Sequence, residues 1–397
     1  MKYDFDKCID RRNTASFKWD WCNLIFGTDD IIPMSIADMD ICVPPQVVDA
    51  LKQRIEHPVL GYTVKTDKFY QAVQNWMQKR HNWQIEDSYI LSTPGIVPAI
   101  NFAVFALTNP GDRILIQPPV YHPFFDAIEL NDRKLLINNL KAKSSKTSGK
   151  SYYEIDFEDF EQKAKQAKLF ILCSPHNPVG RVWTKEELQK IGNICKKHNV
   201  YVLSDEIHND LVFKPTKHIP FSSIKEFSDI SITCMAPSKT FNVAGLCTSI
   251  MIIPNPEIKK ALEDIMMKSG IFMMNIFGMN ALETCYNECE DWLEQLLVYL
   301  DSNRQFVYDY FEKNLPEFTL ADSESTFLIW IDFNSLKMEH NELEEFLVKK
   351  AKVGLDTGIK YGELGRGFMR LNFGCSKKML EEALNRINTA VKELKKR

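Results

Sequence analysis

A chain of 397 residues with 45% hydrophobic and 26% charged residues is long enough for one large or two medium domains around a buried core. This composition excludes a disordered or fibrous protein. The chain has 49 Lys and Arg against 53 Asp and Glu, so its net charge is −4. That balance supplies neither the basic surface of a nucleic-acid-binding protein nor a polybasic membrane anchor.

The N-terminal residues and the cysteines predict the compartment. Residues 1–7 are charged and lack the apolar run of a secretory signal, and no apolar run approaches the roughly 18 residues that cross a bilayer. Ten cysteines are dilute in a chain of this length, as in reduced cytoplasmic proteins. Cys285 and Cys289 have no second Cys or His pair near them in the sequence, so we expect packing and no metal site. We therefore expect a cytoplasmic protein that binds neither nucleic acid nor membrane.

In chain order, residues before about 45 show no periodicity, and a long alternation of apolar runs and amphipathic stretches follows. This alternation is typical of a parallel sheet covered by helices. Thr184 and Glu187 have capping-box spacing and predict a helix over Thr184–His198. The Lys- and Ser-rich tract Lys141–Lys150 is expected to be an exposed loop. The expected strands are Arg113–Gln117, Lys168–Cys173, Val200–Ser204, Ile230–Met235 and Ser249–Ile253.

The pattern changes after about residue 285. A helical stretch over Trp292–Leu315, a strand over Ser325–Phe333 and a final helix over Lys377–Lys396 predict a second, smaller α+β domain. We expect residues 46–285 to form the large domain and residues 286–397 the small one, which residues 1–45 join. Ligands of parallel sheets bind beyond the carboxyl ends of the strands, so the candidate chemistry is sought there.

A lysine directly follows one expected strand, in the stretch Ala236–Gly245. Lys239 at a strand end in a cleft is partly desolvated, which lowers its pKa and makes it able to form a Schiff base. The hydroxyls and backbone N–H groups around it can hold a phosphate. Alone, the tripeptide Ser-Lys-Thr is a weak motif, because most lysines are solvated surface charges.

Three more polar positions follow expected strands. The carboxylate of Asp205 lies at the end of an expected buried strand, where it needs a cation or a hydrogen-bond donor as its partner. A protonated pyridine nitrogen is one such partner. The alternative is that Asp205 caps the N-terminus of a helix. The turn Cys173–Gly180 can aim the Asn177 amide at a ligand oxygen, or be a plain connection. The stretch Thr93–Ala99 opens a helix and is a common kind of anion site.

These stretches occur in one order along the chain, and together they resemble a known family. The sequence is similar to fold-type I pyridoxal 5'-phosphate (PLP) enzymes of the class-II aminotransferase superfamily, and more closely to the MalY/PatB, or cystalysin-like, group of cystathionine β-lyases. This resemblance implies an α/β fold whose large domain holds a mostly parallel, seven-stranded sheet, beside a smaller α+β domain. The matching segments are Phe17–Asp20, Ser35–Asp40, Leu60–Thr63, Pro118–Tyr121, Ser174–Arg181, Ser204–His208, Pro237–Gly245 and Arg370–Asn372.

The resemblance implies roles around the cofactor ring. Lys239 would form the Schiff base with PLP and later move protons, and Asp205 would pair with the pyridine nitrogen. Asn177 would bond the ring hydroxyl, with His208 at the position from which many relatives assist the same oxygen. Tyr121 would stack on the ring. A structural histidine and an ordinary core aromatic remain the alternatives for the last two.

The resemblance also implies a phosphate site and a dimer. The backbone of Gly95, Ile96 and Val97, with the Ser238 hydroxyl, would hold the phosphate. Tyr62 would reach that phosphate from a neighbouring subunit, so a homodimer is expected.

The resemblance also implies which residues bind the substrate. Arg370 would clamp the substrate carboxylate, a task suited to a planar guanidinium, with Asn177 and Ala37 beside the substrate; a surface ion-pair arginine is the alternative. Ala236 and Cys247 stand where many aminotransferases of the superfamily have a Ser and an Arg on the phosphate. These departures argue against a standard aminotransferase phosphate site.

The implied activity is β-elimination from a sulfur amino acid. L-cystathionine, L-cysteine or a cysteine S-conjugate would give pyruvate, ammonia and a thiol. An aminotransferase using the same lysine, aspartate and arginine is one alternative, because the two reactions diverge only after loss of the α-proton. A regulator that binds a protein partner through this fold is another. His122 stands where cystalysin-like sequences can have a second Tyr, which leaves the substrate preference open.

Overall fold

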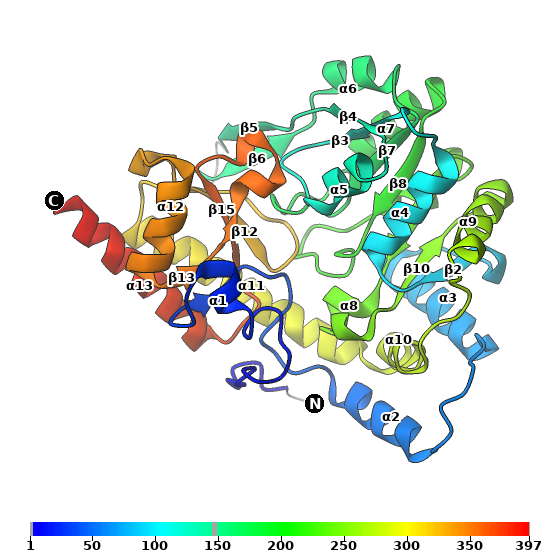
Figure 1. Ribbon diagram of the computed structural model, residues 1–397, viewed down its shortest axis with the longest axis horizontal. Coiled ribbons are helices and arrows are strands. Elements are labelled where there is room, and N and C mark those ends of the chain that lie inside the picture. Colours follow the sequence, from blue (N-terminus) through cyan, green and yellow to red (C-terminus); the bar gives the residue numbers. More distant parts are fainter. Residues whose placement is uncertain (1–2, 145–148, 397) are drawn as a thin grey trace.

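The computed structural model describes residues 3–144 and 149–396, and its centre is a seven-stranded sheet (Figure 1). The strand order is β2-β10-β9-β8-β7-β3-β4, and only β10 runs antiparallel to its neighbours. The predicted sheet is therefore confirmed, with two strands, β2 and β4, that the sequence patterns did not indicate. The strands are β2 (Ile90–Thr93), β3 (Arg113–Ile116), β4 (Lys134–Ile137), β7 (Leu169–Cys173), β8 (Tyr201–Asp205), β9 (Ser231–Met235) and β10 (Ser249–Ile252).

Helices cover both faces of this sheet. Successive residues of a strand face opposite sides, so Ile171 packs in the core under α4, α5 and α9, whereas Phe170 and Leu172 pack in the core under α6 and α7. Thr184 caps α7 in a complete capping box with Glu187, as predicted. These helices are α4 (Ile96–Leu107), α5 (Pro123–Glu129), α6 (Phe157–Ala164), α7 (Lys185–Lys197) and α9 (Pro256–Lys268).

A second, antiparallel sheet follows in the order β11-β12-β15-β14, and the strand and the two long helices predicted after residue 285 are present. The N-terminal segment, blue in Figure 1, lies against this part, because β1 pairs with β13. The domain boundaries at residues 45 and 285 stay a prediction. The elements are α1 (Cys22–Phe26), β1 (Ile32–Pro33), α11 (Glu290–Asn314), β11 (Thr319–Leu320), β12 (Leu328–Asp332), α12 (His340–Phe346), β13 (Val353–Gly354), β14 (Asp356–Thr357), β15 (Phe368–Asn372) and α13 (Lys377–Lys395).

The remaining elements bring one correction and one confirmation. Lys141–Ser144 is a strand, β5, which pairs with β6 (Ser151–Glu154), so the predicted loop is wrong there; residues 145–148 of the tract lie outside the described residues. The expected packing of Cys285 and Cys289 is confirmed, since both are buried in the core. Within the described ranges no helix is long and apolar enough to cross a membrane. The other helices are α2 (Pro45–Glu56), α3 (Asp67–His81), α8 (Pro237–Thr240) and α10 (Ile276–Glu288).

Buried ion pairs hold the segment from Ser35 to Ile41 in place. Lys18 Nζ lies 2.5 Å from Asp40 Oδ2, and both side chains are almost completely buried. Arg11 bridges Asp38 and Asp40 at 2.6 and 2.7 Å, and Trp19 Nε1 donates to Asp40 at 2.7 Å. A buried charge needs such partners, because it has lost its hydration. The N-terminal segment therefore fixes residues 35–41 from one side.

Replacing Lys18 by Met is expected to destabilise the protein strongly. Asp40 stays buried with only part of its countercharge, which costs about 3 kcal/mol of unfolding free energy. Urea unfolding of Lys18→Met measures the loss. Lys260→Met is the control, because its pair with Asp264, at 2.6 Å, is exposed and contributes little in comparison. Equal losses in the two variants would contradict this account of the segment.

Candidate active site

The carboxyl ends of three neighbouring strands lie level at one edge of the large sheet. Asp205 at the end of β8 is the register partner of Cys173 on β7 and of Cys234 on β9. The Asn177 turn follows β7, and α8 with Lys239 follows β9. Parallel pairing thus brings the predicted positions 177, 205 and 239 to the same edge.

Lys239 faces the segment from Ser35 to Ile41. Its Nζ donates a hydrogen bond to the Ala37 carbonyl at 2.6 Å. Burial, with a smaller contribution from nearby Arg370, lowers the pKa of Lys239 to about 8, against the attraction of Asp38 and Asp205. An amine with this pKa is largely charged at neutral pH and releases its proton readily, as a nucleophile and proton carrier must.

Asp205 is a buried carboxylate with few partners. Its Oδ1 accepts the Ile207 N–H at 3.2 Å, and burial raises the pKa of Asp205 to about 7. Among the described residues no Lys, Arg or His nitrogen pairs with this carboxylate. No helix begins directly after β8, because the next helical turn in the described residues starts at Phe221, so the N-cap alternative is wrong.

Arg370 is buried on β15, so the alternative of a surface arginine is wrong. Its Nη1 donates to Asn177 Oδ1 at 3.1 Å, and its Nη2 donates to the Ser35 carbonyl at 2.6 Å and contacts Asp356 Oδ2 at 2.8 Å. Arg370 Nε is buried and has no hydrogen-bond partner within the described part of the chain. One donor of the guanidinium is therefore unpaired among the described residues.

Tyr121 and His208 lie near the charged side chains of this site. Burial, reinforced by the charge of Asp205, raises the pKa of Tyr121 to about 12, so the phenol stays protonated. Burial, with the charges of Lys239 and Arg370, lowers the pKa of His208 to about 3 and keeps the ring neutral. His208 Nδ1 is buried and finds no partner among the described residues.

The predicted anion site opens α4. Gly95 precedes this 12-residue helix with φ +142°, a conformation that side-chain-bearing residues rarely adopt, and the N–H groups of Ile96 and Val97 begin its first turn. Strand β10 connects this end of β2 to the end of β9, because it pairs with both. Ser238 lies partly buried beside Lys239 on α8. These groups flank the same edge of the sheet.

Tyr62 does not join the other positions in this chain. It lies between α2 and α3, and its side chain is 93% exposed. The role predicted for it therefore requires a second subunit.

The sequence patterns missed the groups around Arg370. Asp356 on β14 is the register partner of Arg370, and Tyr361 donates to its carboxylate at 2.6 Å. The Arg370 guanidinium carbon lies 5.2 Å from the centre of the Tyr361 ring. The register of neighbouring strands creates this cluster, so no local sequence motif predicts it.

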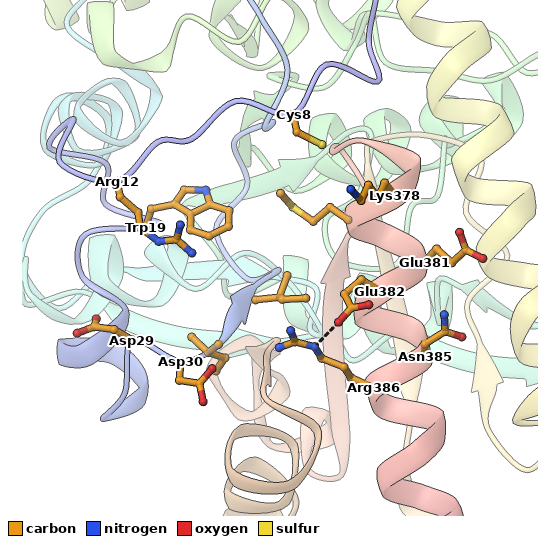
Figure 2. A pocket seen from close by; sticks show the side chains of 13 residues that line it. Cys8, Arg12, Trp19, Asp29, Asp30, Lys378, Glu381, Glu382, Asn385 and Arg386 are labelled. Carbon is orange, nitrogen blue, oxygen red and sulfur yellow. Dashed lines mark hydrogen bonds and ion pairs between the residues drawn. The ribbon is translucent and has the colours of Figure 1, made fainter.

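A different cavity lies away from these residues, between the N-terminal segment and α13. It holds about 450 Å³, and Figure 2 shows Arg386 bonded to Glu382 there. Asp29, Asp30 and Arg12 complete a wall of mixed charge. With both signs of charge present on its wall, this cavity indicates no particular ligand.

The chain matches the model of a protein family over most of its length. The model described as aminotransferase class I and II matches residues 29–387, which is most of the chain. The chain belongs to this family.

Individual relatives show which members of this family the chain resembles. The chain is 42% identical, over 98% of its length, to all of cystathionine β-lyase PatB of Bacillus subtilis, and 31% identical, over 99%, to all of protein MalY of Escherichia coli. The structure of cystalysin from Treponema denticola, which contains a PLP cofactor, matches with a TM-score of 0.95 and 41% identity, covering 99% of this chain and 100% of that one. The predicted fold and the resemblance to the MalY/PatB group are confirmed.

The lowered pKa of Lys239 predicts a pH-dependent stability of the cofactor-free protein. Between pH 8 and about 10.5 only the unfolded chain holds this proton, so the wild-type unfolding free energy rises with pH there, by at most about 3 kcal/mol from this group. Below pH 8 the full penalty of the buried charge applies. Lys239→Met removes the penalty, so its stability advantage is largest near pH 7 and disappears near pH 10.5.

Urea unfolding of both cofactor-free proteins at pH 7 and pH 10.5 measures this difference. Groups that do not interact with Lys239 titrate alike in the two proteins and cancel, whereas Asp205, whose pKa the Lys239 charge lowers, adds a smaller difference near pH 7. An advantage of Lys239→Met that stays constant with pH would show that Lys239 titrates normally.

Proposed function

We propose that this protein is a PLP-dependent carbon–sulfur β-lyase, which converts a sulfur amino acid and water to a thiol, pyruvate and ammonia. The observation that carries the proposal is the group of Lys239, Asp205 and Arg370, three largely buried ionisable side chains in which the charges of Asp205 and Arg370 both act on Lys239. The similarity to PatB, which is named a cystathionine β-lyase, supports the same activity, and the similarity to cystalysin, whose structure contains PLP, supports the same cofactor.

The residues present fit PLP. Asp205 is a buried carboxylate without a cationic partner among the described side chains, and a pyridinium N–H supplies that partner. Lys239 supplies an amine for the aldehyde carbon, and the first turn of α4 supplies N–H groups for the phosphate. His208 Nδ1, which has no partner among the described residues, and Asn177 would bond the ring oxygen, and Tyr121 would offer a ring to stack on.

Bound PLP supplies an electron sink for the pair of electrons left at Cα when the α-proton departs. Asp205 holds a positive charge at the ring nitrogen and so keeps that sink effective. Arg370 binds the substrate carboxylate, and Asn177 keeps the guanidinium oriented. Lys239 Nζ takes the α-proton, with Ala37 O holding the amine in place.

The elimination balances without a further reactant besides water. The Cα–H bond and the Cβ–S bond break, the sulfur leaves with its electron pair and gains a proton, and water releases ammonia and pyruvate. The aminotransferase alternative is not favoured, because the relatives at 31–42% identity include a named cystathionine β-lyase and Ala236 and Cys247 depart from the aminotransferase pattern. No exposed surface in the described residues argues for the regulatory alternative by itself.

We extend the proposal to a homodimer in which Tyr62 reaches the phosphate of the partner's site. An aromatic side chain that is 93% exposed is unusual, and Leu60 and Val64, two residues away on either side, are more than half exposed as well. Burial of this apolar surface against a second copy supports the dimer. Free thiols at all ten cysteines support action in the cytoplasm.

Pyruvate release tests the function. The PLP-loaded protein is expected to release many equivalents of pyruvate per subunit from L-cystathionine with no keto acid added. Asp205→Asn is expected to lower kcat/KM at least about 100-fold, because a neutral amide does not hold the pyridinium charge. Asp229→Asn is the matched control, since Asp229 is an exposed partner of Lys196. A single equivalent of pyruvate that stalls would contradict the lyase and favour transamination.

Mixing two inactive variants tests the shared site. Lys239→Ala and Tyr62→Ala are each expected to be nearly inactive alone. After subunit exchange at equal amounts, half of the dimers contain both variants, and one of their two sites has an intact Lys239 and an intact partner Tyr62. Activity should return to about a quarter of the wild-type value. No recovery, although mass spectrometry detects mixed dimers, would show that Tyr62 acts within its own subunit.

A further inference from the structure

Arg370, the proposed carboxylate clamp, already lies beside a negative charge of the chain itself. Asp356 Oδ2 is 2.8 Å from Arg370 Nη2, and both side chains are buried. The two residues are register partners on β14 and β15, so the backbone holds them side by side. Tyr361 donates to the same carboxylate oxygen at 2.6 Å, and burial raises the pKa of this phenol, so Tyr361 stays protonated. These contacts keep Asp356 next to Arg370 when a substrate binds.

A substrate carboxylate brings a second negative charge to the same place. The guanidinium of Arg370 has one positive charge, which Asp356 already compensates. Two carboxylates that share one buried guanidinium repel each other, and the repulsion is strong where solvent is excluded. Binding of the substrate carboxylate is therefore favoured by a further positive charge close to Asp356.

Lys360 has the required charge and position. Its Nζ lies 3.5 Å from Asp356 Oδ1, and about half of its side chain is exposed. Among the described residues, no third Lys or Arg nitrogen beside those of Lys360 and Arg370 lies within 4 Å of this carboxylate. His122 faces the Tyr361 ring nearby, but burial lowers the pKa of His122, so this imidazole adds no charge at neutral pH.

The backbone ties Lys360 to the segment of the proposed cofactor site. Lys360 belongs to the helical turn Gly358–Tyr361, which directly follows β14. The N–H group of Val120 donates to the carbonyl of Tyr361 at 3.0 Å, and Val120 directly precedes Tyr121. The turn that carries Lys360 is therefore held both by the strand of Asp356 and by the segment of Tyr121.

We propose that Lys360 is a positioning residue of the substrate site, which compensates the charge of Asp356 when the substrate carboxylate binds Arg370. The inference rests on the proposed function, because it concerns the arginine that binds the carboxylate there. With the substrate bound, Arg370 and Lys360 supply two positive charges, and Asp356 and the α-carboxylate supply two negative ones. Without Lys360, one buried negative charge has no counterpart. Lys360 thus acts on substrate binding through Asp356 and Arg370 and takes no part in the bond-breaking steps.

Ligand binding to the PLP-loaded protein tests the proposal without turnover. 2-Methylalanine has the amino group and the carboxylate but no α-proton, and isopropylamine is the same molecule without the carboxylate. The absorbance of the bound PLP measures both dissociation constants. Lys360→Met is expected to raise that of 2-methylalanine about fivefold, the size of effect that a half-exposed ion pair can produce, and to leave that of isopropylamine unchanged. Lys360→Arg keeps the charge and should restore binding to within about twofold of wild type.

Two comparisons show whether the effect passes through Asp356. Lys349→Met is the matched control, because Lys349 is an exposed lysine that pairs with Glu345, and it should change neither dissociation constant. In an Asp356→Asn background, Lys360→Met should have no further effect, since the negative charge that Lys360 compensates is gone. 2-Methylalanine has no second carboxylate, so a contact between Lys360 and a distal group of L-cystathionine does not contribute to the result.

An unchanged dissociation constant of 2-methylalanine in Lys360→Met, or equal changes for both ligands, would overturn the proposal. An effect that persists in full in the Asp356→Asn background would overturn it too. If 2-methylalanine responds as expected but L-cystathionine yields no pyruvate, the lyase reaction is refuted and the role of Lys360 stands. A protein that takes up no PLP would refute the proposed function and this inference together.

Discussion

The segment from Ser35 to Ile41 is the constraint on which the candidate site depends. The buried pair of Lys18 and Asp40 holds it from the N-terminal side. From the turn after α8, Asn242 bonds the backbone of Met39 and Ile41, and from the small sheet Asn372 donates to the carbonyls of residues 36 and 38. Because these restraints come from three distant parts of the chain, the carbonyls that face Lys239 and Arg370 have fixed positions. The site therefore forms only when all three parts are packed.

Burial shapes the chemistry of the site more than any single charge pair. It lowers the pKa of Lys239 and raises that of Asp205, because in both cases the charged form loses its hydration. Arg370 differs, since Asp356 and two oxygen acceptors compensate its charge. The site thus holds one compensated cation and two groups whose charges need a ligand, which is the condition that a charged cofactor and a zwitterionic substrate satisfy.

Much of the fold and part of the site followed from local patterns. Apolar runs predicted five of the seven strands of the large sheet, and the two missed ones, β2 and β4, are its edge strands; the side chains of β4 are half exposed or exposed. Strand ends predicted Asp205 and Lys239, because a polar residue after a buried run is a local signal. Asp356 and Ser35 had no such local signal. Asp356 meets Arg370 through the register of β14 with β15, and the Ser35 carbonyl accepts a hydrogen bond from Arg370, 335 residues away in the chain.

The sequence by itself determined which residue types stand at the ends of the strands, and, through the matching motifs, the family and its cofactor. Periodicity and chain order carry that information, because they depend only on neighbours along the chain. Tertiary structure alone decided which of these groups meet and how far burial shifts their pKa values. These properties depend on desolvation and on contacts between the N-terminal segment and both sheets, and both arise only when distant segments pack together.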